Sequence, residues 1–225
     1  MRAVQGEGPS LGRRCAFVRL GGCNLGCTWC DTPYTWDWKG DGDSGRAYDP
    51  RQELHAMPWQ AVAEQLRAYS VPLVVVSGGE PLSQQNRLLP LLRELAGTGH
   101  GIEIETNGTV APLPEVAALA RFNVSPKLAH SGEPEARRLV PEALAAFARL
   151  PGTAFKFVCR DVDDLDEVAD VVGRFGTRPV WIMPAARSRE ELAHNLEALG
   201  DEVIGRGWNL TTRLHIAVWG DRRGV

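Results

Sequence analysis

Three cysteines close together in the sequence are its clearest candidates for chemistry. Cys23, Cys27 and Cys30 follow the spacing C-x₃-C-x₂-C, so that their three thiols can converge on one point. Thiolates are the ligands that zinc and iron–sulfur clusters take from cysteine in proteins. The spacing therefore predicts a metal centre.

The identity of the metal depends on a fourth ligand. A structural zinc site takes four protein ligands, and no further Cys or His stands at finger-like spacing around the three cysteines. Cys15 and Cys159 lie in apolar segments, where we expect them to be buried in the core. A [4Fe–4S] cluster held by three cysteines leaves one iron open to an external ligand, which departs from the usual four-cysteine arrangement. The pattern favours such a cluster and leaves zinc as the alternative.

The elements that must position the cysteines are predicted to be strand–helix repeats. Short apolar segments rich in β-branched residues alternate with longer segments of helical periodicity. The expected strands are 16–20, 73–77, 102–106, 122–125, 154–159, 180–183 and 214–219. The expected helices are 58–69, 86–96, 141–150, 165–175 and 189–204, with room for only a short helix between 106 and 122. The cysteines follow the first of these strands, at the sheet edge where α/β proteins bind ligands.

The strands also indicate the fold class. Most of them are apolar on both faces, which is typical of a parallel sheet covered by helices. We therefore expect an α/β fold in a single domain, residues 1–225: a partial, open TIM-type (β/α) barrel with about six core parallel strands, fewer than a closed barrel needs. A doubly wound sheet with the same element order is the alternative. The Asp- and Gly-rich segment 37–50 is expected to be a solvated loop, because its acidic residues miss the spacing of a calcium loop.

The composition argues against several classes of function. A chain of 225 residues can bury a core that needs neither disulfides nor a structural metal. A net charge of −3, without a block of Lys and Arg, disfavours nucleic acid as a partner. No apolar segment is long enough to span a bilayer, so we expect no membrane partner. The first eight residues lack the features of a secretory signal, and we expect a cytoplasmic protein.

Several motifs, taken in order, resemble those of a known enzyme family. With Trp29 before the last cysteine, the cysteine motif resembles that of radical S-adenosylmethionine (SAM) enzymes, which are built on full or partial (β/α) barrels. Ser77-Gly78-Gly79-Glu80-Pro81 resembles the GGE motif of that superfamily, although alone it would indicate only a strand-to-helix turn. Further segments resemble the 7-carboxy-7-deazaguanine synthase (QueE) family over nearly the whole chain: 5–8, 19–24, 30–32, 105–108, 125–127, 213–215 and 219–225.

The resemblance implies a reaction and a set of cofactors. That family is a carbon–nitrogen lyase that converts 6-carboxy-5,6,7,8-tetrahydropterin to 7-carboxy-7-deazaguanine and ammonia. The product serves the biosynthesis of queuosine and related 7-deazapurines. The implied cofactors are a [4Fe–4S] cluster, SAM and Mg²⁺. The implied partners are an external one-electron donor of flavodoxin or ferredoxin type and a second copy of the chain in a homodimer.

The resemblance also implies roles for individual residues. Cys23, Cys27 and Cys30 would hold the cluster, whose open iron would bind the amino and carboxylate groups of SAM. Further residues implied to contact SAM, together with Cys30, are Trp29, Asp31, Gly79, Glu80, Ser125, Pro126 and Lys127. Residues implied to contact the substrate are Val4, Gln5, Gly6, Glu7, Arg19, Ser77, His215 and Val225, and Glu7, Arg19 and His215 would also be catalytic.

Residue chemistry agrees with several of these roles. The carboxylate of Glu80 would supply charge to the SAM ammonium group, and the planar fork of Arg19 suits the substrate carboxylate. The side chains of Gln5 and Glu7 match the donors and acceptors of a pterin edge. Thr32 would bind Mg²⁺, a cation that takes oxygen ligands, and its alternative role is a helix cap before Pro33. A solvated cation is the alternative role for a lysine such as Lys127 at the end of a strand. The remaining histidines have no motif around them and are expected at the surface: His55, His100, His130 and His194.

Two other functions compete with this interpretation. Another radical SAM enzyme, such as an activase that generates a glycyl radical on a partner protein, would share the cysteines and Gly79 but would not need residues 5–7, Arg19 and Thr32. A zinc-binding module is the more distant alternative, since it lacks a fourth ligand. The chain has four residues before Gln5, where the family has a longer lead-in that forms the first strand, which leaves open how this edge is built.

Overall fold

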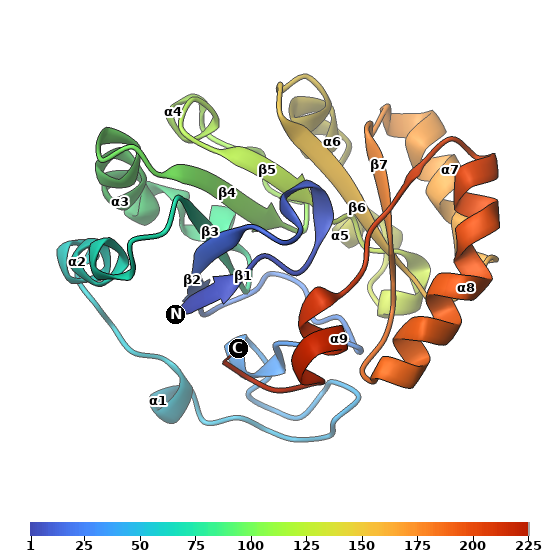
Figure 1. The fold of residues 1–225 in the computed structure, drawn as a ribbon, viewed down its shortest axis with the longest axis horizontal. Helices are drawn as coiled ribbons and strands as arrows, with labels where there is room; N and C mark the ends of the chain where they lie inside the picture. The colour runs from blue at the N-terminus through green and yellow to red at the C-terminus, as the bar shows by residue number, and fades with distance from the viewer. Residues whose placement is uncertain (225) are drawn as a thin grey trace.

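A curved eight-stranded sheet organises the computed structural model, which describes residues 1–224. The strands follow one another in chain order across the sheet (Figure 1). They are β1 (Arg2–Val4), β2 (Arg14–Leu20), β3 (Leu73–Gly78), β4 (Gly101–Thr106), β5 (Arg121–Val124), β6 (Thr153–Cys159), β7 (Val180–Pro184) and β8 (Asn209–Leu210). β1 is antiparallel to β2, and β2 to β8 are parallel.

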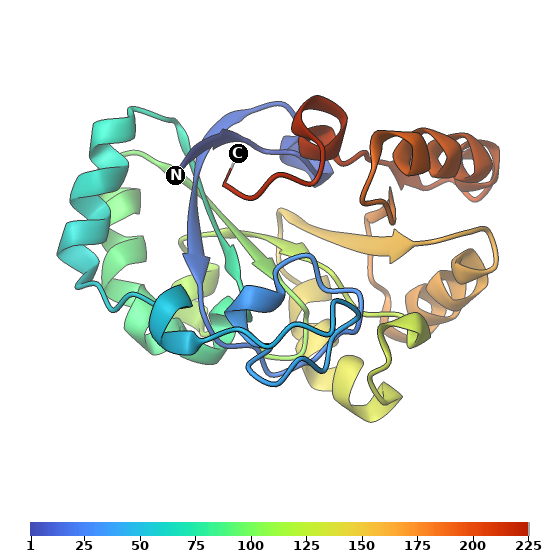
Figure 2. The same cartoon turned by 90° about the horizontal axis from the view of Figure 1, so that it is seen from below.

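Helices between successive strands cover the outer side of the sheet (Figures 1 and 2). The longer ones are α2 (Trp59–Tyr69), α3 (Gln85–Gly97), α6 (Pro141–Ala148), α7 (Asp164–Phe175) and α8 (Arg189–Gly205). Four further helices are short: α1 (Pro50–Glu53), α4 (Pro114–Ala117), α5 (Glu135–Arg138) and α9 (Leu214–Trp219). Of these, α9 follows the last strand, and α1 and α9 lie away from the outer layer (Figure 1). The sheet does not close on itself, since β1 and β8 are its two edges. This confirms the partial, open (β/α) barrel. Within residues 1–224, no helix is long and apolar enough to cross a membrane.

The expected core strands and helices are confirmed, with ends shifted by a few residues at most. The predicted strand at 214–219 is wrong, because Leu214–Trp219 forms the helix α9. A helix buries only Ile216 of this segment and leaves Val218 and Trp219 exposed, whereas a strand inside a covered sheet would need both faces buried. The edge strands β1 and β8, of three and two residues, were not predicted.

Alternation along each strand divides the barrel into an apolar outer layer and a polar interior. Residues such as Val74, Val76, Ile104 and Phe157 pack into the main core cluster between the sheet and the helices, where Cys159 is also buried as expected. Cys15 is likewise fully buried, in a small cluster with Leu73 and Val75. The alternate positions near the carboxyl ends of β2 to β6 are polar and line the interior: Arg19, Ser77, Glu105, Asn123 and Lys156.

The segment 37–50 is a loop whose residues are mostly exposed, as expected, and it is anchored at its first residue. The Asp37 side chain is buried, and its carboxylate accepts hydrogen bonds from the backbone N–H groups of Gly40, Asp41 and Gly42 at 2.8 to 2.9 Å. These three bonds fold the segment around one carboxylate and bring residues 42–48 to the mouth of the interior.

Candidate active site

A cavity of about 880 Å³ opens at the carboxyl ends of the parallel strands. Its walls are the polar interior side chains of the strands, the cysteine-bearing segment after β2, and the end of the chain up to Gly224. Arg223 fastens that end of the chain, because its guanidinium pairs with Glu53 at 2.6 Å and lies 3.7 Å from the centre of the Tyr34 ring. One large cavity thus collects nearly all the motifs that the sequence analysis singled out.

The three cysteines line one wall of this cavity. Burial raises the pKa of the Cys23 thiol to about 11 and also raises that of Cys27. Thiols in this state bind a metal only by losing their protons to it, so that metal binding and deprotonation are coupled. The amide of Asn107 reaches the Cys23 sulfur at 4.0 Å, and the Thr32 hydroxyl lies 3.6 Å from the Cys30 sulfur.

The donor set fits an iron–sulfur cluster. Among residues 1–224, no three His, Cys, Asp or Glu side chains converge as they would around a single metal ion. The cysteines nevertheless present three soft sulfur ligands to one partly enclosed space, with polar groups beside two of the sulfurs. Such hydrogen bonds tune the potential of iron–sulfur centres. Cys23, Cys27 and Cys30 would therefore hold the cluster.

Two glycines at the end of β3 allow the cysteine segment to pack against the strand end. Gly78 adopts φ +128°, a conformation that other residues avoid, and a Cβ there would lie 2.2 Å from the Leu20 carbonyl oxygen. A Cβ on Gly79 would lie 1.8 Å from the Gly22 carbonyl oxygen. The backbone N–H of Glu80 donates to that same oxygen at 2.8 Å. Gly79 therefore lines the cavity and also fixes the backbone that leads into the cysteines.

Glu80 does not line the cavity, so a direct contact of its carboxylate with SAM remains a prediction. Its side chain is fully buried and accepts hydrogen bonds from the N–H groups of Leu82 and Asn107 and from the Thr106 hydroxyl, at 2.7 to 2.9 Å. Burial raises the pKa of this carboxyl. Because its donors come from both segments, Glu80 connects the loop after β3 to the end of β4 and the loop that follows. Its role is to shape the wall on which Gly79 lies.

The other residues expected near SAM lie on the cysteine side of the cavity, with one exception. Lys127 donates a hydrogen bond to the Ser125 hydroxyl at 3.1 Å, and its ammonium lies 5.5 Å from the centre of the Trp29 ring. All three line the cavity, but Pro126 between them is buried and does not. Asp31 also lines the cavity, and its carboxylate accepts a hydrogen bond from Arg213 at 2.5 Å.

Ser77, Arg19 and Glu105 form a connected polar group on the neighbouring strands β3, β2 and β4. The Ser77 hydroxyl donates to Glu105 at 2.9 Å and accepts from the Arg19 guanidinium at 3.4 Å. Glu105 was not among the expected site residues, although it begins one of the matching motifs. Its place on the interior face of β4 follows from the strand register, which pairs it with Asn123 of β5.

The Gln5 side chain is already saturated by the protein. Its amide nitrogen donates to Glu103 at 2.8 Å and to Glu105 at 3.0 Å, and its oxygen accepts from the Gly6 N–H at 2.8 Å. Gln5 lines the cavity but is only 1% exposed. A direct contact of Gln5 with the substrate remains a prediction, and the structure shows that the residue orients Glu105.

Glu7 lies in a buried group of charges that the sequence did not reveal. Its carboxylate forms an ion pair with Lys156 and lies 3.5 Å from Nε of Arg213. Burial alone would raise the pKa of Glu7, but the charges of Lys156 and Arg213 outweigh it and lower that pKa well below its ordinary range. The signal that could have revealed Lys156 is a lone lysine inside the apolar strand 154–159.

His215 and Gly6 are in close contact next to Glu7. A Cβ on Gly6 would lie 2.7 Å from Nδ1 of His215, so that only glycine leaves room for the imidazole. Burial lowers the pKa of His215. Val4, Gly6 and Thr32 also line the cavity. Val225 lies outside the described residues.

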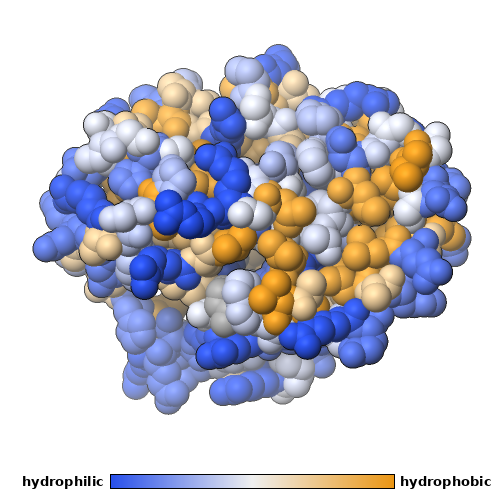
Figure 3. Space-filling view, in the orientation of Figure 1, coloured by the Kyte–Doolittle hydropathy of each residue, from blue (hydrophilic) through white to orange (hydrophobic). Residues whose placement is uncertain are grey.

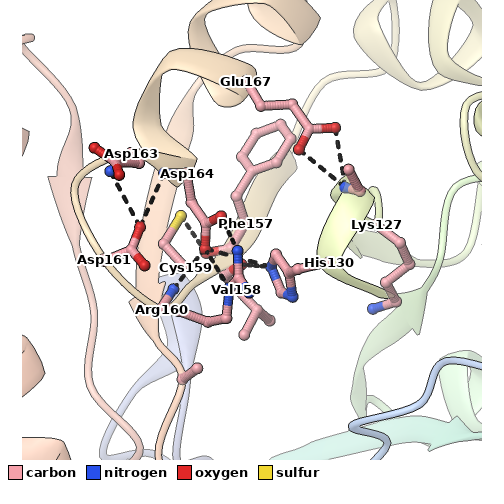
Figure 4. A network of polar contacts seen from close by, with 12 residues as sticks. Lys127, His130, Phe157, Val158, Cys159, Arg160, Asp161, Asp163, Asp164 and Glu167 are labelled. Carbon is pink, nitrogen blue, oxygen red and sulfur yellow. Dashed lines mark hydrogen bonds and ion pairs between the residues drawn. The ribbon is translucent and has the colours of Figure 1, made fainter. Parts of the chain in front are cut away.

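The expectation that His130 is a surface residue is wrong. Its side chain is only 3% exposed, and its ring packs against Trp29 with the centroids 5.3 Å apart. Nε2 contacts the Val158 carbonyl oxygen at 3.1 Å and the Asp164 carboxylate at 3.6 Å (Figure 4). The turn after β5 brings His130 to β6, a contact that no local motif shows. His55 and His194 are exposed and His100 is half-buried, in agreement with the expectation for those residues.

Comparison with known proteins agrees with this geometry. A model of the radical SAM superfamily matches residues 17–127. A 7-carboxy-7-deazaguanine synthase of Pyrobaculum aerophilum is 37% identical over 99% of this chain and 93% of its own length. The enzyme of the same name from Hyperthermus butylicus is 32% identical, over 96% and 89%.

Solved structures show the same fold. The crystal structure of QueE from Escherichia coli matches with a TM-score of 0.68 and 25% identity, over 96% of this chain and 92% of that one. Streptococcus suis SuiB bound to its precursor peptide SuiA matches with a TM-score of 0.59 at 15% identity, over half of its length, and shows the fold alone. The identity of 37% to the Pyrobaculum aerophilum synthase extends over nearly the full length of both chains and confirms the resemblance in the sequence motifs. The chain belongs to the 7-carboxy-7-deazaguanine synthase family within the radical SAM superfamily.

Proposed function

We propose that this chain converts 6-carboxy-5,6,7,8-tetrahydropterin to 7-carboxy-7-deazaguanine with release of ammonia. The observation that carries the proposal is that one cavity is lined by two sets of residues. Three cysteines and Trp29 form the set that we call the cysteine wall, and the charged groups of Arg19, Glu105 and Glu7 belong to the set that we call the polar wall. A radical enzyme needs this arrangement, because the cofactor and the polar substrate must meet in a space that excludes water. The product belongs to the biosynthesis of queuosine and other 7-deazapurines.

The cofactors follow from membership of the radical SAM superfamily. A [4Fe–4S] cluster and SAM, when bound, supply a carbon-centred radical that begins the reaction. Lys127 and Ser125 place a cation and a hydroxyl on the cysteine side, and both suit the carboxylate and hydroxyl groups of SAM. Trp29 offers an aromatic surface to the nucleoside. Its own ring is held between His130 and Lys127.

The polar wall suits a carboxylated pterin. The guanidinium of Arg19 can bind the substrate carboxylate through two parallel hydrogen bonds. Glu105 and Glu7 are acceptors for the ring N–H groups, and the polar contacts of each carboxylate with the protein fix its position. A pocket that satisfies ring polar atoms rejects analogues that lack them. His215, packed against Gly6, completes this wall.

Thr32 remains our candidate for the Mg²⁺ site. It lines the cavity, and its hydroxyl lies 3.6 Å from the Cys30 sulfur. Mg²⁺ keeps several waters and needs few protein ligands, so one hydroxyl together with substrate oxygens is a reasonable set. There the ion could orient the substrate and stabilise developing negative charge.

The alternatives are less well supported. The curated relatives that match nearly the whole chain are named as 7-carboxy-7-deazaguanine synthases, and the polar wall of Arg19, Ser77 and Glu105 would have no purpose in an activase of glycyl-radical proteins. A zinc-binding module would not need a cavity of this size or its second wall.

We further propose a single-domain enzyme that acts as a homodimer. The continuous sheet supports one domain. Figure 3 shows apolar side chains gathered on the face seen there, and Val218 and Trp219 of α9 are among the exposed large apolar residues. We expect a flavodoxin or ferredoxin as the electron donor, no nucleic-acid or membrane partner, and the cytoplasm as the location, because a reducing compartment keeps the cysteines free.

An anaerobic assay tests the proposed function. Reconstituted protein is incubated with SAM, reductant, Mg²⁺ and 6-carboxytetrahydropterin, and 7-carboxy-7-deazaguanine and 5′-deoxyadenosine are measured by mass spectrometry. The proposal requires both compounds. Deoxyadenosine without deazaguanine would refute the substrate assignment but not the cofactors. Neither compound, from protein shown to hold its cluster, would refute both the substrate assignment and the cleavage of SAM.

A further inference from the structure

Lys156 is a buried cation inside the barrel in direct contact with Glu7. It lies on β6, whose residues are all buried and, next to the lysine, apolar. Its side chain is 6% exposed, and that of Glu7 is 13% exposed. Taking a lysine out of water is costly unless an anion accompanies it. The Glu7 carboxylate is that anion, and both groups line the cavity.

Other charges surround this pair on every side. Arg213, which precedes α9, and His215 on α9 face Glu7. Glu105 on β4 and Asp31 in the cysteine segment face Lys156. Arg213, however, divides its guanidinium between Asp31 at 2.5 Å and the Ala186 carbonyl at 2.6 Å, and its Nε lies 3.5 Å from Glu7. Lys156 is therefore the partner in closest contact with the Glu7 carboxylate.

The pair determines the protonation state of Glu7. Burial would raise the pKa of this carboxyl, and the positive charge of Lys156 is the largest influence that lowers it. Burial is the largest single influence on Lys156 and would lower its pKa, but the charges of Glu7, Glu105 and Asp31 and the hydrogen bond to Glu7 together raise that pKa. Both groups thus stay charged. An ionised carboxylate only accepts hydrogen bonds, whereas a protonated carboxyl also donates one.

We infer that Lys156 is a positioning residue, which holds the Glu7 carboxylate ionised and oriented so that it accepts hydrogen bonds from the N–H groups of a pterin. The inference rests on the proposed function, since it requires a pterin in contact with Glu7. Lys156 itself acts through Glu7. Its removal should therefore matter only while residue 7 is a carboxyl group.

Ligand binding across pH tests this without turnover. Holoenzyme is titrated anaerobically with 6-carboxypterin, without reductant, and the dissociation constant is followed by pterin fluorescence. Without the lysine charge, burial keeps Glu7 protonated to higher pH, so the pH below which binding weakens should rise by about 1 to 3 units in K156M. K156Q is a second neutral variant with a hydrogen-bond donor and should show the same rise. K156R keeps the cation and should restore most of the wild-type profile.

Two controls separate this role from a structural one. K39M changes an exposed lysine and should leave the dependence of the dissociation constant on pH unchanged. A shift that K39M shared with K156M would come from pH effects on the ligand or the cluster. In an E7Q background, K156M should change neither the affinity nor its pH dependence, because the group that Lys156 acts on is gone. Unfolding temperature and cluster absorbance establish that each variant is folded.

The outcomes distinguish this inference from the proposed function. A wild-type pH profile in K156M and K156Q would overturn the role of Lys156 and leave the proposed function intact. The same loss of affinity from K156M in both backgrounds would also overturn it, because Lys156 would then act on the ligand or the fold directly. If wild-type protein binds no carboxypterin at any pH, both the inference and the assignment of the polar wall fail.

Discussion

The hydroxyl of Ser77 donates a 2.9 Å hydrogen bond to the carboxylate of Glu105, which joins the ends of β3 and β4 inside the cavity. Arg19 on β2 reaches the same hydroxyl at 3.4 Å, and Gln5 donates to the same carboxylate at 3.0 Å. Four segments distant in sequence are thus connected by one hydroxyl and one carboxylate. This network determines the shape of the polar wall in the protein without ligand.

Removing the Ser77 hydroxyl should weaken substrate binding more than it slows the chemical step. S77A deprives Glu105 of one donor and leaves Arg19 without its only side-chain acceptor among the described contacts. A hydrogen bond to a charged group contributes about 1.5 to 3 kcal/mol, so we expect KM to rise about tenfold or more. Steady-state kinetics check this, with S83A at an exposed serine as the control. An unchanged KM in S77A would show that the network does not contact the substrate.

Adding one methyl group at Gly79 should disturb the cysteine wall. In G79A the new Cβ would lie 1.8 Å from the Gly22 carbonyl oxygen, so the strand end and the cysteine segment must separate. We expect a loss of about 1–3 kcal/mol in the free energy of unfolding and less iron per chain after reconstitution. In G97A, at the end of α3, a Cβ meets nothing within 4 Å, and this variant should be as stable as wild type or slightly more so. Full iron content and unchanged stability in G79A would contradict the packing described for this wall.

The stability of the protein should depend on pH through Glu103. Its buried carboxylate accepts hydrogen bonds from Gln5, Ser10 and Asn123, and burial raises its pKa despite them. Between the unfolded value of about 4.3 and the raised folded value, the folded state keeps a proton that the unfolded state has lost. Its contribution to stability is therefore complete below about pH 4.3 and is lost as pH rises through the folded pKa.

The E103Q variant isolates this effect. A glutamine can keep the contacts with Gln5 and Asn123 and has no proton to lose, so wild type should lose stability relative to E103Q as pH rises through this window. Urea unfolding at several pH values between about 4 and 8 measures the difference, with exposed E115Q as the control. A pH-independent difference between wild type and E103Q would refute the assignment.

His130 should stabilise the fold through its Nε2 atom. The hydrogen bond to the Val158 carbonyl joins the turn after β5 to the end of β6, and the neighbouring Asp164 carboxylate also binds the Arg160 side chain at 2.9 Å (Figure 4). H130F leaves that carbonyl without its side-chain donor and should cost about 1–3 kcal/mol. H130Q places an amide nitrogen near the position of Nε2 and should cost less. Chemical unfolding followed by tryptophan fluorescence compares the two; equal stability of H130F and wild type would contradict this role.

Local sequence pattern was sufficient for most of the barrel and for the cysteine wall. The run Leu73 to Val76 is apolar and β-branched, and such a segment before a glycine pair has few alternatives to a buried strand. Residues 214–219 mislead because Leu214, Ile216 and Val218 alternate with other residues as in a strand. In the structure this segment is the helix α9, which buries only Ile216 and leaves Val218 and Trp219 exposed. How much of the segment is buried depends on its place in the fold, which the local pattern does not show.

The polar wall depends on register, which local pattern does not show. The lone Lys156 in an apolar strand is a signal in the sequence, but the sequence does not show which side chains of other strands Lys156 and Glu105 meet inside the barrel. The contacts of Glu80 depend on tertiary structure for a related reason. The motif indicated the importance of Glu80, but its three donors come from Leu82, from Thr106 at the end of β4 and from Asn107 after it. The motif therefore identified an important residue, but the residues that contact it depend on the tertiary structure.

The most direct test of the two-wall account compares wild type, C27S and R19K in one anaerobic assay of deoxyadenosine and deazaguanine. Wild type should form both compounds. C27S should form neither, because it lacks a cluster ligand. R19K should keep the cluster and form deoxyadenosine but lose most deazaguanine, because lysine cannot present two parallel hydrogen bonds to the substrate carboxylate. Wild-type protein that holds its cluster and cleaves SAM without forming deazaguanine would contradict the account, and so would R19K with undiminished product.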